Sequence, residues 1–89
     1  MNDIQTIVDE LLLEIVGKRK TIAASKHLVE DLGFDSLKMV ELMVAVEDRF
    51  DIAIPVADAS RIRTVGELYA AVERVRRDAA DAAAVAVAG

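Results

Sequence analysis

The sequence predicts an all-α fold, a small antiparallel four-helix bundle with a short third helix and a long loop between the first two helices. Two observations predict it. Three long segments space their apolar residues three and four positions apart, as an α-helix with one buried side does. No segment alternates apolar and polar residues in the manner of a half-buried strand. The length of 89 residues corresponds to one domain.

The first helix is expected over residues 3–16, with Gly17 ending it. Residues 17–35 carry no long helical pattern and are expected to form a loop. Leu28 and Leu32 are the apolar residues that would anchor this loop to the core. A loop of this length in a small domain usually serves a function, so it is a first place to search for a site.

The second helix is expected over residues 36–50. Asp35 and Ser36 are both suitable as its N-cap, and the local pattern does not choose between them. Pro55 suits the first turn of a helix, and we place the short third helix at about residues 56–61.

The last helix is expected to begin at Thr64, because Thr64-Val65-Gly66-Glu67 matches the capping box. From residue 78 the chain is rich in alanine and poor in large side chains. This segment is compatible with a continued helix, a frayed helix or disorder. We therefore expect a domain over residues 1–77 and an Ala-rich tail over residues 78–89.

Composition excludes several classes of function. The chain has no cysteine and a single histidine, His27, so disulfides, a Cys nucleophile, a multi-His metal site and a hydrolase triad are not expected. Few aromatic residues argue against nucleic-acid binding by base stacking. The acidic N-terminus and the lack of a long apolar run predict a soluble, cytoplasmic protein that does not enter the membrane.

The negative charge is concentrated in the middle of the chain. Residues 30–58 hold eight acids and two bases, a net charge of −6, whereas the whole chain has −5. Such a segment favours basic partners and repels nucleic acid. The alternative is an acidic surface that serves only solubility.

The segment 36–50 has two apolar sides when it is drawn as a helix. An ordinary core stripe consists of Met39, Leu42, Met43, Val46 and Phe50. A second group, here called the docking strip, consists of the apolar Leu37, Val40 and Val44 and the acids Glu41, Glu47 and Asp48. Apolar area bordered by acids is typical of a transient docking surface for a basic partner. Alternatively, the short helix or the long loop covers the strip.

Ser36 opens this helix. By position alone it is most simply a helix cap. The free amides and partial positive charge of a helix N-terminus also accommodate an attached phosphate. Ser36 is therefore either a helix cap or a site of phosphate attachment, and the residues around it distinguish the two.

The run Glu30-Asp31-Leu32-Gly33-Phe34-Asp35-Ser36-Leu37, continued by Val40-Glu41-Leu42, resembles the attachment motif of the acyl carrier protein family, in its free-standing type II form. The Phe50-Asp51-Ile52 helix end, the Ile54-Pro55 step and the Thr64-Val65-Gly66 start extend the resemblance over about residues 3–77.

The resemblance implies that a phosphopantetheinyl transferase, using coenzyme A and magnesium, attaches 4′-phosphopantetheine to Ser36. Asp35 matches the acid that assists this metal. The thiol of the arm would carry acyl, aminoacyl or peptidyl groups as thioesters, and the chain itself would catalyse nothing. Partners would be acyl-loading and acyl-transferring enzymes with basic docking patches, bound by a monomer through the docking strip. The alternative is a carrier-like module that uses the acidic surface only to bind proteins.

Two departures from the family pattern favour a specialised pathway over housekeeping fatty-acid synthesis. Lys38 stands where fatty-acid carriers often have an acid, and the short helix has one acid, Asp58, with Arg61 and Arg63 nearby. Polyketide, nonribosomal peptide and modified-lipid assembly remain open. Six further apolar residues have two possible roles: they either line a cavity for an acyl chain or simply pack in the core. They are Leu42, Val46, Ile54, Ile62, Val65 and Leu68.

Overall fold

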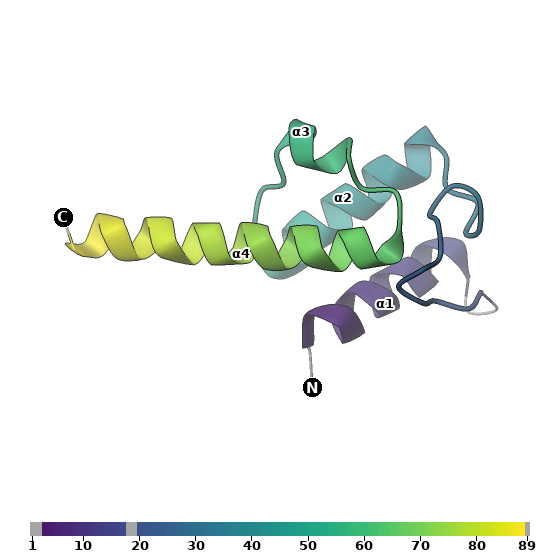
Figure 1. Ribbon diagram of the computed structural model, residues 1–89, viewed down its shortest axis with the longest axis horizontal. Coiled ribbons are helices and arrows are strands. Elements are labelled where there is room, and N and C mark those ends of the chain that lie inside the picture. The colour runs from purple at the N-terminus through teal and green to yellow at the C-terminus, as the bar shows by residue number, and fades with distance from the viewer. Residues whose placement is uncertain (1–2, 18–19, 89) are drawn as a thin grey trace.

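The computed structural model describes residues 3–17 and 20–88, with side chains described over 4–17 and 20–80. The helices are α1 (Asp3–Val16), α2 (Ser36–Phe50), α3 (Val56–Ala59) and α4 (Val65–Ala88) (Figure 1). Within the described ranges the only β-type pairing is an isolated bridge between His27 and Thr64. The predicted all-α bundle with a short third helix is confirmed.

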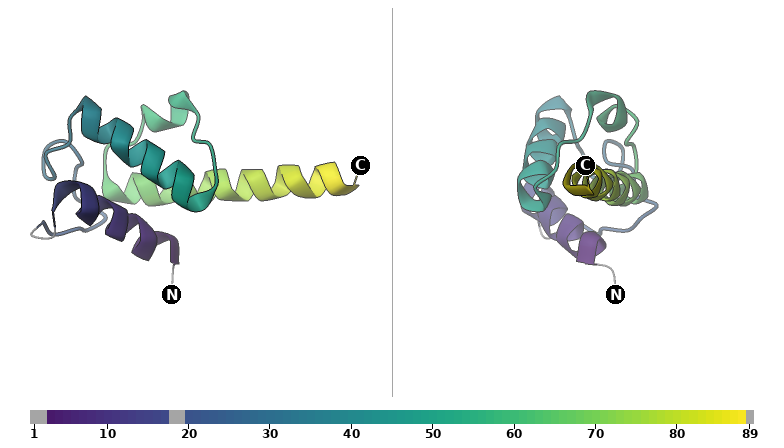
Figure 2. Two further views of the ribbon diagram at one scale, coloured as in Figure 1. Left: turned by 180° about the vertical axis from the view of Figure 1, so that it is seen from behind. Right: turned by 90° about the vertical axis from the view of Figure 1, so that its left-hand side faces the viewer.

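Helix α1 packs against both α2 and α4. It runs antiparallel to both of them, while α2 and α4 point in the same general direction (Figures 1 and 2). The short α3 lies on the side of α4 opposite α1 (Figure 2). In this arrangement α2 and α3 lie beside each other on one side of the molecule (Figure 2).

The core contains apolar residues of the three long helices together with residues of the loops. Of the predicted stripe of α2, Leu42 and Val46 are buried, and Met39, Met43 and Phe50 are partly buried against them. Apolar side chains separated by three or four positions face inward, as the helical period requires. The buried residues are Val8, Leu11, Leu12, Leu28, Leu32, Phe34, Leu42, Val46, Ile54, Ile62, Val65, Leu68, Ala71, Val72 and Val75. No polar or charged side chain is buried among the described residues.

The long loop is anchored as predicted, because Leu28 and Leu32 are buried. Phe34 adds a third buried anchor just before α2. The amide of Leu28 donates to the carbonyl of Arg63 at 2.9 Å, and the amide of Phe34 donates to the carbonyl of Leu28 at 2.9 Å. These bonds tie the loop to the α3–α4 connection and fix the chain where it enters α2.

The third helix is shorter than the predicted 56–61 and ends at Ala59. The amides of Arg61 and Ile62 bond to carbonyls three residues earlier, which tightens the chain into turns. These turns carry Ile62 into the core.

Helix α4 continues to Ala88, so residues 78–88 adopt the continued-helix alternative. This part of α4 projects beyond the bundle (Figure 1). The last buried side chain among the described residues is that of Val75. The described side chains of this segment, those of residues 78–80, are all exposed.

Candidate functional site

Asp35 is the N-cap of α2. Its Oδ1 accepts a hydrogen bond from the amide of Lys38 at 2.9 Å, and its backbone is extended. The structure thus decides between the two predicted caps. Ser36 is the first helical residue, its side chain is exposed, and its Oγ makes no hydrogen bond to any residue that the structure describes.

The position of Ser36 at the surface follows from the residues before it. Gly33 has φ of +75°, a left-handed conformation that favours glycine. Phe34 then buries its ring next to the start of the helix. A turn at Gly33 and an anchor at Phe34 leave Asp35 and Ser36 facing solvent.

The surroundings of Ser36 Oγ fit a covalently attached phosphate. The hydroxyl needs no partner within the protein, so modifying it breaks no hydrogen bond to the described chain. The first amides of a helix have no helical acceptor and favour a negative charge. Asp35 engages one carboxylate oxygen in the cap, and its Oδ2 is left for other ligands.

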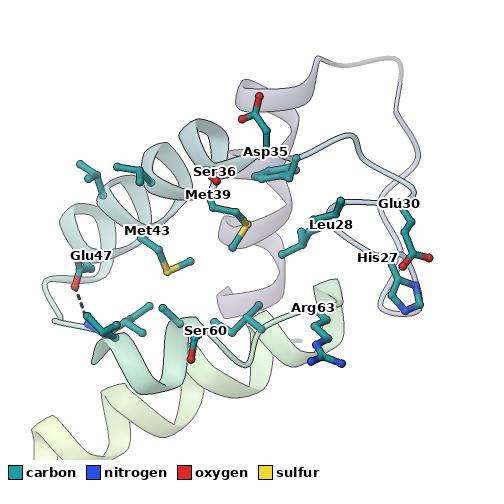
Figure 3. A pocket seen from close by; sticks show the side chains of 18 residues that line it. His27, Leu28, Glu30, Asp35, Ser36, Met39, Met43, Glu47, Ser60 and Arg63 are labelled. Atoms are coloured by element: carbon teal, nitrogen blue, oxygen red, sulfur yellow. Dashed lines mark hydrogen bonds between the residues drawn. The ribbon is translucent and has the colours of Figure 1, made fainter.

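An open groove of about 1480 Å³ lies between α2 on one side and α3 with the α3–α4 connection on the other (Figure 3). Asp35 and Ser36 lie at its rim. Its apolar lining includes Leu28, Phe34, Met39, Met43, Ile54 and Ile62. The groove therefore offers an apolar surface that begins beside the free hydroxyl.

The six residues for which core and cavity roles were both considered divide into two groups. Ile54 and Ile62 are buried and also line the groove. The core role applies to Leu42, Val46, Val65 and Leu68, which are fully buried and lie outside the groove lining.

Met39 and Met43 were assigned to the core stripe, and the structure places them half-buried along the groove. Met43 lies at the margin of the core stripe nearest the docking strip, and this position is the signal that could have shown its place, whereas Met39 lies in the middle of the stripe and carries no such signal.

The apolar part of the docking strip is exposed. Leu37, Val40 and Val44 are 67%, 59% and 60% exposed, so neither the short helix nor the long loop covers them. Glu41 and Asp48 are exposed as well, and their carboxylates make no hydrogen bond or ion pair with the described residues.

Glu47 differs from the other acids of the docking strip. It is half-buried, and its Oε2 accepts a hydrogen bond from the amide of Ile54 at 2.7 Å. The single acid of α3 is also engaged, because Asp58 forms an ion pair with Arg74 of α4. Among the acids of the docking strip and α3, the carboxylates without a partner in the described residues are therefore those of Glu41 and Asp48, both on α2.

His27 is a loop residue at one end of the groove. Its amide donates to Asp31 at 2.7 Å, and this hydrogen bond is the main reason that the pKa of the Asp31 carboxyl is lowered. The described part of the chain holds no cluster of three or more acidic, histidine or cysteine side chains that could bind a metal.

The family model described as a phosphopantetheine attachment site matches residues 5–72. The chain belongs to the acyl carrier protein family. Acyl carrier proteins are carriers without catalytic activity, and they hold 4′-phosphopantetheine covalently. The predictions of the family, the cofactor and a non-enzymatic role are confirmed. Interaction with a phosphopantetheinyl transferase and with acyl-handling enzymes follows from membership.

Curated relatives are acyl carrier proteins by name. The meromycolate extension acyl carrier protein of Mycolicibacterium aurum is 36% identical over 76 residues, which cover 84% of this chain and 78% of that protein. The acyl carrier protein of Syntrophobacter fumaroxidans is 41% identical over 63 residues, covering 71% of this chain and 78% of that protein.

Solved acyl carrier protein structures have the same fold. A candidate acyl carrier protein from Mycobacterium tuberculosis superposes with a TM-score of 0.76 at 41% identity, covering 79% of this chain and 95% of that one. The acetyl actinorhodin acyl carrier protein of Streptomyces coelicolor gives a TM-score of 0.67 at 25% identity, covering 84% of this chain and 92% of that one.

Within the described residues, no helix is both long enough and apolar enough to cross a membrane.

Proposed function

We propose that Ser36 is the attachment residue for 4′-phosphopantetheine and that residues 1–77 form the carrier domain. The observation that carries the proposal is the exposed Ser36 Oγ, free of hydrogen bonds to the described residues, at the first turn of α2 and at the rim of the apolar groove. The arm on Ser36 presents acyl, aminoacyl or peptidyl thioesters to partner enzymes.

Attachment is a phosphoryl-type transfer from coenzyme A. Ser36 Oγ forms a bond to the phosphorus next to the pantetheine, and the bond from that phosphorus to the bridging oxygen of the pyrophosphate breaks. Adenosine 3′,5′-bisphosphate leaves, and the hydroxyl proton passes to a base of the transferase. Asp35 would assist the magnesium ion through the carboxylate oxygen that does not cap α2.

Partner enzymes with basic patches would dock on the exposed side of α2. Leu37, Val40 and Val44 offer apolar area, while Glu41 and Asp48 offer free carboxylates. Such charges accelerate encounter more than they strengthen the final complex. The monomeric chain would meet each partner in turn.

A specialised pathway, such as polyketide, nonribosomal peptide or modified-lipid assembly, is favoured over housekeeping fatty-acid synthesis. Lys38 near the attachment residue and the neutralised acid of α3 support this choice. Relatives named for meromycolate extension are compatible with it.

Intact-protein mass spectrometry tests the attachment residue. The chain is incubated with a broad-specificity transferase, coenzyme A and magnesium. The wild type should gain the mass of one phosphopantetheine, and Ser36→Ala should gain none. Ser25→Ala and Ser60→Ala are matched controls, because these are the other serines of the chain, and both should be loaded normally.

Equal loading of Ser36→Ala and the wild type would disprove the assignment. A chain that is isolated from its host without the arm, although it can be loaded in vitro, would instead favour the carrier-like binding module.

A further inference from the structure

Glu47 and Ser36 lie at different points along the same groove. They are eleven residues apart on α2. Three turns of helix therefore separate them by about 16 Å and bring Glu47 back to nearly the same side as Ser36. Figure 3 shows Ser36 near one end of α2 and Glu47 near the other, and both residues line the groove.

Glu47 holds the chain that leads from α2 into α3. Its Oε2 accepts from the amide of Ile54 at 2.7 Å, and its backbone carbonyl accepts from the amide of Ile52 at 3.1 Å. The side chain of Ile54 is buried and lines the groove. The carboxylate thus fixes the backbone of a residue whose side chain shapes the groove.

Helix α3 is anchored mainly by the residues that flank it, since Ile54 and Ile62 are buried. It has four residues and none of them is buried, and Val56 is 85% exposed. The Asp58–Arg74 ion pair connects α3 to α4. This ion pair does not fix the distance between α3 and α2. Among the described residues, the Glu47–Ile54 hydrogen bond is the side-chain hydrogen bond that joins α2 to the segment entering α3.

We propose that Glu47 is a positioning residue that holds α3 against α2 and thereby sets the width of the groove for the carried acyl chain. This proposal rests on the proposed function, since it assumes cargo on Ser36. In this role Glu47 affects which acyl chains fit the groove, and it acts through the side-chain oxygen that accepts the hydrogen bond from the Ile54 amide. A docking role would depend on its negative charge.

Substitution by glutamine separates these two roles. Glu47→Gln removes the charge and keeps a carbonyl oxygen that can accept from the Ile54 amide, whereas Glu47→Ala removes both. Glu41→Ala is the comparison variant, because it removes a carboxylate of the same helix that bonds to no described residue.

The first measurement is amide hydrogen exchange by NMR in the unmodified protein, so it does not depend on Ser36 being loaded. Exchange of the Ile54 amide should be about tenfold faster or more in Glu47→Ala, as expected for loss of a hydrogen bond to a charged group. It should stay near the wild-type rate in Glu47→Gln and Glu41→Ala. The core amides of Leu42 and Val46 report global stability and should not change.

The second measurement uses acetyl and palmitoyl arms, placed on Ser36 by a broad-specificity transferase from the corresponding acyl-coenzyme A. In the wild type and Glu47→Gln, the palmitoyl form should have a higher thermal midpoint than the acetyl form. This difference should shrink in Glu47→Ala, because α3 is no longer held against the groove.

The proposal is overturned if Glu47→Ala leaves both the Ile54 exchange and the acyl-dependent midpoint unchanged. It is also overturned if Glu47→Gln behaves like Glu47→Ala in both measurements, since charge would then be the relevant property. Absence of loading in every variant, with the exchange effect present, would contradict the assignment of Ser36 and leave the Glu47–Ile54 contact established.

Discussion

Asp35 caps α2 through a 2.9 Å hydrogen bond from the amide of Lys38, and the neighbouring Ser36 hydroxyl is left free. The start of the helix therefore does not depend on the residue proposed to carry the arm. A carrier protein must fold both before and after modification, and this division of roles permits it.

The division of roles predicts that two adjacent substitutions differ in their effect on the free energy of unfolding. Asp35→Ala should lower the free energy of unfolding by about 1 kcal/mol, because the cap is lost. Ser36→Ala should change it by less than about 0.5 kcal/mol, as is usual for exposed sites. Urea unfolding measures both. A larger loss for Ser36→Ala than for Asp35→Ala would contradict the assignment of the cap.

Asp35→Asn tests the proposed role of the carboxylate in loading. Asparagine caps a helix about as well as aspartate, so the stability should stay near that of the wild type. The rate of phosphopantetheine transfer should fall, because the amide is a poorer magnesium ligand than a carboxylate. An unchanged rate at saturating magnesium would exclude this role for Asp35.

Charge reversal tests the docking strip. Glu41→Lys with Asp48→Lys should raise the KM for the transferase about tenfold at low salt, and added salt should reduce the difference, since salt screens exposed charges. Asp48 is substituted instead of Glu47 because the Glu47 side chain also accepts a hydrogen bond from Ile54 in the α2–α3 connection. The fold should be retained.

The matched control reverses two exposed acids of α1, Glu10 and Glu14, and so changes the net charge by the same amount. Its KM should change much less. Equal effects in the two double variants would show that only net charge matters and that α2 has no special role in docking.

Glu67 makes the stability of the start of α4 depend on pH. Its carboxylate accepts from the amides of Thr64 at 2.9 Å and Arg63 at 3.0 Å, while Thr64 Oγ1 accepts from the Glu67 amide at 3.1 Å. The predicted capping box is thus confirmed. The bonds to Thr64 and then Arg63 lower the pKa of Glu67 from its ordinary value of 4.5.

A pKa that is lower in the folded state means that folding is favoured by the charged form. This stabilisation is present above the ordinary pKa of 4.5 and is lost as the pH falls through the lowered folded value. Glu67→Gln should therefore be less stable than the wild type at neutral pH, and the two should converge on acidification. Urea unfolding at a series of pH values measures this. A constant difference at all pH values would contradict it.

Removal of residues 78–89 tests the proposed domain boundary. Every buried side chain among the described residues lies at or before Val75, so a chain that ends at Arg77 retains the whole core. We expect a small change in thermal midpoint and an unchanged rate of loading. Loss of loading in the folded truncated chain would show that the C-terminal part of α4 belongs to the functional unit.

Local patterns predicted much of the fold and of the site. Apolar spacing placed the three long helices, and a second apolar side on residues 36–50 predicted the exposed strip of Leu37, Val40 and Val44. The Thr64–Glu67 pair marked the start of α4. These features depend on residues within one or two turns of each other, so the order of residues determines them.

Contacts between distant segments required the tertiary structure. The direction of α1 against α2 and α4, the groove along Met39 and Met43, and the Asp58–Arg74 pair all depend on how helices pack. Periodicity shows which side of a helix is apolar. It does not show whether that side meets a core or a groove, and this is why the sequence left both roles open for Leu42, Val46, Val65 and Leu68.

The sequence alone determined the all-α class, the helices and the family motif around Ser36, because helical period, capping and motif spacing are properties of neighbouring residues. Only the tertiary structure decided that Asp35 caps α2 while Ser36 Oγ stays free, and that Glu47 bonds to the Ile54 amide. The physical reason is that a hydrogen bond depends on distance and direction in space, which the folded chain sets through the turns and packing on either side of α2.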